Sequence, residues 1–174
     1  MTLRTRHLVE AQIPALRRFA FALTRERDAA DDLVQDCLAR ALTRWHLLRS
    51  EDKLRAWLFR ILRNLYHDAH RHRARRPEAG AVDPDDLAGT TVDAETVVFL
   101  GDVLGALARL PIEQQEVLLL VGVEDFSYEA VARILGVPKG TVMSRLARGR
   151  EALREMTGHD RPDRPRRPHL RRLK

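Results

Sequence analysis

Apolar residues recur at helical spacing along most of this chain, and these stripes set the elements that we expect. Positions three and four apart lie on one face of a helix, so a stripe at that spacing predicts an amphipathic helix. Leu, Ala, Arg and Val are abundant and aromatic residues make up only 5%, which also favours helices over sheets. Outside residues 126–150, the expected helices cover residues 7–24, 28–45, 53–75, 94–109 and 113–122. In the first of them, Pro14 either starts the main segment or kinks it.

The stretch 126–150 predicts two further helices joined by a tight turn. Ser127 suits the N-cap of the first helix, because its hydroxyl can accept an unpaired backbone N–H. Gly136 supplies the left-handed residue that ends this helix at little cost. Pro138 suits the start of the second helix, where its missing N–H is not needed.

The second of these two helices carries small, polar and basic side chains opposite its apolar face. Val142 and Leu146 share the apolar face, while Thr141, Ser144 and Arg148 point the other way. This layout is typical of a helix-turn-helix, whose second helix enters a major groove. The alternative is a bundle of amphipathic helices with solvated arginines, but bundles seldom need small residues along an exposed face.

The predicted helix 53–75 has one apolar and one basic face. The apolar face carries Leu54, Leu58, Ile61, Leu62 and Leu65. The outer face carries Arg60, Arg63, Asn64, His67 and Arg71. Only one acid, Asp68, lies among these bases, whereas a solvated face usually mixes both signs, so nucleic-acid binding is favoured over plain solubility. The spacing of His67, His70 and His72 cannot place all three on one helical face, which argues against a metal site.

The predicted helix 28–45 begins at Asp28 as a plausible N-cap. Its inner face carries Ala30, Val34, Leu38, Ala41 and Trp45. Acids between residues 28 and 36 could suggest a metal or acid–base pair, but nothing else in the sequence converges on them, so a solvated or partner-docking face is favoured. The sequence has no phosphate-cradling glycine loop and no nucleophile elbow, and we predict no catalytic residue, metal or cofactor.

Composition and charge indicate the partner and the compartment. The chain has 174 residues, a formal net charge of +6 and a pI of about 10.3, which points to a polyanionic partner. Its single cysteine, Cys37, excludes an internal disulfide and suggests a reducing compartment. No stretch has the pattern of a membrane span or a signal peptide, so we expect a soluble cytoplasmic protein.

These observations predict an all-α protein with two small helical domains. Residues 77–93 carry five acids and no Lys or Arg, which indicates an acidic flexible linker. Residues 1–76 then form the first domain, and residues 94–157 form the second domain with its helix-turn-helix. Residues 158–174 predict a basic disordered tail.

Four motifs, taken in order, resemble the extracytoplasmic-function class of bacterial RNA polymerase sigma factors. They are Ala-Asp-Asp-Leu-Val-Gln-Asp at residues 30–36, the stretch 54–64, Leu110-Pro111, and the stretch 128–148. The resemblance implies a factor that docks on core RNA polymerase, melts a downstream promoter element with its first domain and reads an upstream element with its second. It also implies an anti-sigma factor as a further partner.

The resemblance further implies roles for individual residues. The face that grips the polymerase carries Asp32, Leu33, Gln35 and Asp36. The loop 46–52 would capture a base flipped out of the non-template strand, and that strand would be tracked by Arg60, Asn64, His67 and Arg71. The upstream element would be read by Lys139, Thr141, Ser144, Arg145 and Arg148.

Two other functions compete with this interpretation. A helix-turn-helix regulator would bind duplex DNA without polymerase, but the sequence offers no dimerisation helix or ligand pocket. A module that only titrates an inhibitor would not need the basic faces that both domains carry.

Overall fold

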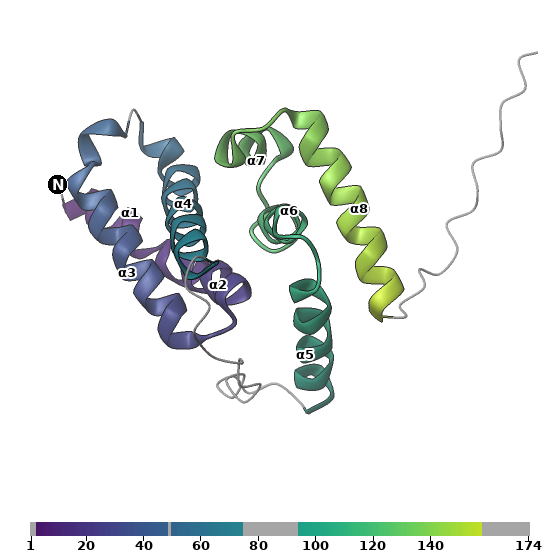
Figure 1. The fold of residues 1–174 in the computed structure, drawn as a ribbon. Helices are drawn as coiled ribbons and strands as arrows, with labels where there is room; N and C mark the ends of the chain where they lie inside the picture. Colours follow the sequence, from purple (N-terminus) through teal and green to yellow (C-terminus); the bar gives the residue numbers. More distant parts are fainter. Residues whose placement is uncertain (1–2, 49, 75–93, 158–174) are drawn as a thin grey trace, which may run out of the picture.

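The structure, a computed structural model, describes residues 3–48, 50–74 and 94–157, and these residues are helical with no strand (Figure 1). The predicted all-α fold is therefore confirmed. The predicted linker, 77–93, and the predicted tail, 158–174, lie outside the described residues. The helices are α1 (Leu3–Glu10), α2 (Ile13–Thr24), α3 (Arg27–Thr43), α4 (Leu54–Ala74), α5 (Ala94–Ala108), α6 (Ile112–Gly122), α7 (Tyr128–Leu135) and α8 (Lys139–Thr157), with two short 3-10 helices, η1 (Trp45–Leu47) and η2 (Glu51–Lys53).

The first domain consists of α1 to α4, in which α2, α3 and α4 pack against one another (Figure 1). All five residues of the predicted apolar stripe on α4 are buried, as expected. The single helix predicted for residues 7–24 is instead two helices that separate at Ala11 and Gln12. Pro14 lies in the first turn of α2, where its missing N–H costs no hydrogen bond.

The start and end of α3 differ from the prediction by one or two residues. Asp28 is not the N-cap, because α3 begins at Arg27 after the extended residue Glu26. Asp28 lies instead in the first turn, where its negative charge complements the helix dipole. The helix ends at Thr43, and Trp45 falls in η1.

The second domain consists of α5 to α8, and α8 packs on the other three helices. The hydroxyl of Ser127 caps α7 by accepting the backbone N–H of Ala130 at 3.2 Å, as the sequence predicts. Gly136 ends α7 in the left-handed region at φ 69°. At Gly149 the helices approach so closely that an added Cβ would lie 2.8 Å from Leu118 Cδ1. The helix-turn-helix is thus fixed on α6 through a position without a side chain.

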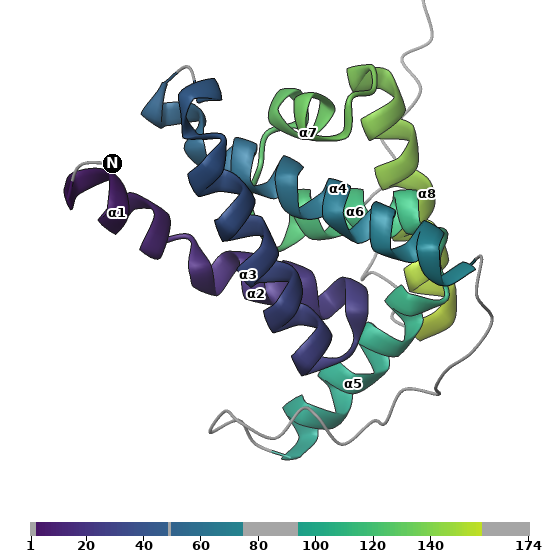
Figure 2. The ribbon, with the colours of Figure 1, turned by 60° about the vertical axis from the view of Figure 1, so that its left-hand side comes forward.

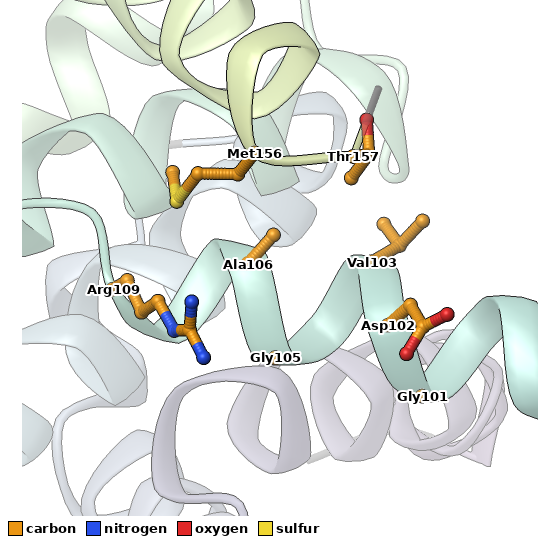
Figure 3. A pocket seen from close by; sticks show the side chains of 8 residues that line it. All are labelled: Gly101, Asp102, Val103, Gly105, Ala106, Arg109, Met156 and Thr157. Carbon is orange, nitrogen blue, oxygen red and sulfur yellow. The ribbon is translucent and has the colours of Figure 1, made fainter. Parts of the chain in front are cut away.

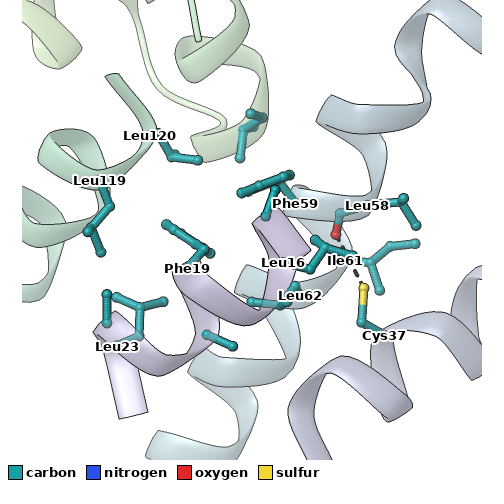
Figure 4. Close-up of a cluster of buried hydrophobic side chains, with 14 of the residues drawn as sticks. Leu16, Phe19, Leu23, Cys37, Leu58, Phe59, Ile61, Leu62, Leu119 and Leu120 are labelled. Carbon is teal, nitrogen blue, oxygen red and sulfur yellow. Dashed lines mark hydrogen bonds between the residues drawn. The ribbon is translucent and has the colours of Figure 1, made fainter. Parts of the chain in front are cut away.

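The two domains pack against each other, with α2 beside α6 and α4 beside α7 (Figures 1 and 2). Their buried residues form one hydrophobic cluster, in which Leu119 and Leu120 of α6 lie across from Phe19 and Phe59 (Figure 4). The ring of Phe59 lies 5.3 Å from Phe19 and 5.0 Å from Phe126 of the second domain, measured between centroids. Aromatic residues therefore join the two cores.

Cys37 is fully buried in the first domain, where its thiol donates to the carbonyl oxygen of Leu58 at 3.4 Å (Figure 4). Burial raises the pKa of this thiol to about 12, because the thiolate would lose its hydration. No helix in the described ranges has the length and apolar character that crossing a membrane requires.

Candidate nucleic-acid and polymerase interfaces

The N-terminal half of α8 presents an exposed face that includes most of the residues predicted to read DNA. Lys139, Ser144 and Arg148 are exposed there. Thr141 and Arg145 are partly buried at the edge of this face. The face is held outward because the opposite side of α8 is packed into the core of the second domain.

Two of these side chains already have partners inside the domain. Lys139 forms an ion pair with Glu129 of α7, and the hydrogen bond from its ammonium lowers the pKa of the Glu129 carboxyl. The Ser144 hydroxyl donates to the carbonyl oxygen of Thr141 at 3.0 Å. Arg148 has no acidic partner in the part of the chain that the structure describes, so its guanidinium is available to a ligand.

The basic face of α4 is only partly open to solvent. Arg60, Asn64 and Arg71 are exposed, and Arg71 lies 2.5 Å from a carboxylate oxygen of Asp68. His67 is half-buried, because it lies under the second domain. The structure therefore does not place the four predicted strand-tracking residues on one free surface.

Glu116 of α6 covers the middle of this basic face. Its Oε1 lies 2.9 Å from Nε of Arg63 and 2.6 Å from Nε2 of His67. The side chain of Glu116 is fully buried. A carboxylate of the second domain is thus bound by two cationic or potentially cationic side chains of the first.

Glu124, which follows α6, makes a second contact of the same kind. Its Oε2 lies 2.9 Å from Nη2 of Arg55 and 3.3 Å from Nη2 of Arg18. The Arg55 guanidinium also stacks on the ring of Phe126, 4.3 Å from its centroid. Glu124 is 1% exposed, so this charge too is enclosed between the domains.

Neither of these two acids was predicted to be a functional residue. Glu116 lies three and four residues before Leu119 and Leu120, which places it on the buried face of α6. An acid on an apolar face is a signal for a buried partner, and this signal could have identified Glu116. Glu124 lies outside any periodic stretch and offered no comparable signal.

The acidic face of α3 is exposed, with one correction to the predicted set. Asp32, Gln35 and Asp36 are all exposed. Leu33 is 8% exposed and belongs to the core, so it cannot lie on the surface of this face. It belongs to the hydrophobic cluster beneath this face.

The predicted base-capture loop, 46–52, is shaped by η1 and η2. Trp45 meets Trp57 of α4 edge-to-face with ring centroids 6.1 Å apart. The Ser50 hydroxyl donates to the carboxylate of Asp52, and this bond lowers the pKa of Asp52. Residue 49 of this loop lies outside the described ranges.

A pocket of about 390 Å³ lies between α5 and the C-terminal end of α8. Figure 3 shows Met156 and Thr157 on one side of it and Val103 and Ala106 on the other. None of the residues predicted to bind DNA or polymerase lines this pocket.

Comparison with known proteins connects both domains to one family. Residues 9–63 match the family model described as "Sigma2 domain of PhyR", and residues 100–153 match "Sigma-70, region 4". The chain is 40% identical over 147 residues to "ECF RNA polymerase sigma factor EcfG" of Rhodopseudomonas palustris, covering 82% of this chain and 79% of that protein. It is 35% identical over 144 residues to "ECF RNA polymerase sigma factor SigM" of Mycobacterium tuberculosis, covering 83% of this chain and 72% of that protein.

A solved structure extends this similarity to the arrangement of the helices. The sigma factor RpoE of Bartonella quintana, solved in complex with the anti-sigma factor NepR, superposes with a TM-score of 0.77. It is 34% identical, and the match covers 92% of this chain and all of that one.

Proposed function

The chain belongs to the extracytoplasmic-function class of RNA polymerase sigma factors, and we propose that it uses three separate surfaces for this work. Sigma factors of this class bind core RNA polymerase and direct it to promoters. The observation that carries the assignment is that both domains match, in order, rather than the helix-turn-helix alone. A regulator that binds duplex DNA unaided would not need the first domain.

The first proposed surface is the acidic face of α3, which would dock on the polymerase. Asp32, Gln35 and Asp36 are exposed along about one turn of the helix. Carboxylates so placed can pair with cations of a partner and set its orientation. Leu33 holds the helix in place from the core.

The second proposed surface is the basic face of α4, together with the loop that precedes it. Arg60, Asn64 and Arg71 are exposed and can contact the phosphates of a melted strand. Opening a duplex without ATP requires that the separated strand be held as it forms, because unpairing costs a few kcal/mol per base. A cationic helix beside a loop that captures a base would supply that binding energy.

The third proposed surface is the exposed face of α8, which would read the upstream element in the major groove. Arg148 and Ser144 lie one turn apart on it and can reach base edges. Lys139 lies at the helix N-terminus, where free backbone N–H groups also attract phosphate. Contacts of the first kind specify sequence, and contacts of the second kind position the domain.

We also propose that the protein has no catalytic activity of its own, works in the cytoplasm and is held in check by an anti-sigma factor. Sigma factors are not enzymes. The related sigma factor of Bartonella quintana is bound by the anti-sigma factor NepR, which makes an equivalent partner reasonable here.

In vitro transcription tests the proposal directly. The purified full chain is mixed with core RNA polymerase and genomic fragments, and transcripts are mapped. We expect promoter-specific initiation that depends on the added chain. Tight duplex binding without polymerase, and no transcripts with it, would support a stand-alone regulator instead.

A further inference from the structure

We propose that Glu116 and Glu124 act as an internal clasp that holds the second domain over the cationic face of the first and keeps single-stranded DNA from it. The two carboxylates pair with cationic side chains that would otherwise neutralise phosphates of a bound strand. The inference rests on the proposed function, because it takes the basic face of α4 to be the strand-binding surface.

The ion pairs that Glu116 and Glu124 form between the two domains all have the same polarity. Both acids come from the second domain, while their partners come from the first domain, on α2 and α4. The partners are Arg63 and His67 for Glu116, and Arg18 and Arg55 for Glu124. A face that attracts DNA phosphates is therefore covered by carboxylates of the same chain.

The clasp covers part of the predicted strand-tracking surface itself. His67 is one of the four residues predicted to follow the strand, and it lies on α4 between Asn64 and Arg71. Arg63 neighbours Asn64 on the same helix, and its side chain is 19% exposed in the closed arrangement. A strand cannot contact these two side chains while Glu116 occupies them.

The carboxylates are incompletely satisfied, which suits a contact that must open. Each acid pairs through one oxygen, and the other oxygen, Oε2 of Glu116 or Oε1 of Glu124, is buried with no partner among the described residues. Burying a charge without full hydrogen bonding is costly, and an apolar pair would close the same boundary more firmly. The closed arrangement therefore needs cationic side chains opposite the two acids, but these ion pairs stabilise it only weakly.

A double variant of the full chain separates the clasp from a general charge effect. Glu116→Gln with Glu124→Gln keeps the side-chain shapes and removes both negative charges. Glu113→Gln with Glu155→Gln removes two exposed acids of the same domain and serves as the matched control. Spin labels on Asp28→Cys in α3 and Arg150→Cys in α8, both exposed, report the distance between the domains, since Cys37 is buried.

We expect the wild type and the control to give a mainly short distance distribution with a minor longer component, and the clasp variant to give a longer and broader one. Without polymerase, a fluorescent single strand of about 12 nucleotides should bind the clasp variant roughly 10-fold more tightly than the control. That factor corresponds to a wild type that is open about one tenth of the time.

An unchanged distance distribution in the clasp variant overturns the inference. An opened variant that binds the strand no better than the control overturns it as well.

The proposed function fails in a different way. If that proposal is wrong, neither protein supports promoter-specific transcription with core polymerase, whatever the distance measurement gives. If only the clasp is wrong, transcription remains while the variant and the control behave alike.

Discussion

The two DNA-facing helices of this protein, α4 and α8, differ in how ready they are to bind. The face of α8 is exposed in the folded chain, and its Arg148 has no acidic partner in the described ranges. The face of α4 is divided, with Arg60 open to solvent and His67 covered by Glu116 of the other domain. A helix that reads duplex DNA can be presented permanently, whereas one that binds a melted strand is needed only after melting begins.

The largest expected effect is a loss of stability when a core side chain of α8 is shortened. The packing of such side chains is what holds the DNA-facing side of α8 outward. Leu146 is 3% exposed in the core of the second domain, so Leu146→Ala should destabilise that domain by about 2–5 kcal/mol. Denaturant titration followed by circular dichroism measures the loss. Met143→Ala is the matched control, because Met143 is 50% exposed and should cost under about 0.5 kcal/mol. Equal losses for the two variants would contradict the packing of α8.

A smaller effect should separate the reading and positioning residues of α8. Arg148→Ala should cost about 1–3 kcal/mol on the preferred upstream element and less on sites with a changed base. Lys139→Ala should weaken binding equally on all sequences, because a phosphate contact carries no base information. Affinities for the preferred site and single-base variants, at fixed salt, measure both. A uniform loss for Arg148→Ala would make it a phosphate contact and leave specificity to Thr141, Ser144 or Arg145.

The next effect distinguishes the open and covered parts of the α4 face. In the free chain, Arg60→Ala should weaken single-strand binding about 5-fold to 10-fold and reduce the salt dependence, because an accessible phosphate contact is lost. His67→Ala should weaken it less, since the same change also removes a contact that holds the second domain over α4. Fluorescence titrations over a salt series give both numbers. Equal weakening by the two variants would show that the second domain does not shield α4.

The smallest effect is a pH dependence confined to the first domain. Burial raises the pKa of Cys37 from 9.0 to about 12, so the unfolded chain releases this proton at lower pH than the folded chain. The contribution of Cys37 therefore falls as the pH rises above about 9, by about 0.8 kcal/mol near pH 9.5, and is constant below that range. Denaturant titrations of the wild type and Cys37→Ala measure the difference in slope. A parallel pH dependence of the two proteins would argue against the burial of this thiol.

The features that could be predicted from the sequence are those that depend only on residues within a single helix. The period of Leu54, Leu58 and Leu62 gave the buried side of α4, and Ser127 and Gly136 gave the ends of α7, because such signals act over a few residues. The family match in both domains followed from motifs of the same local kind.

The features that could not be predicted depend on contacts between distant parts of the chain. A helical period separates a polar face from an apolar one, but it does not say that Arg63 would meet an acid 53 positions later. Leu33 was assigned to the surface through the family motif, although its packing in the core is what decides its exposure. Pro14 predicted a start or a kink in the first helix without deciding between them, and the structure shows a start, with α2 beginning at Ile13.

The position of Phe59 bears on how the molecule melts. Its ring touches Phe19 in its own domain and Phe126 in the other, so neither core is complete while the other is unfolded. Unfolding of either domain would expose the fully buried ring of Phe59 to water and remove one of its aromatic contacts. Both changes cost free energy. Two units that share a side chain in this way unfold cooperatively, and a calorimetric scan of the closed protein should give a single heat-absorption peak rather than two.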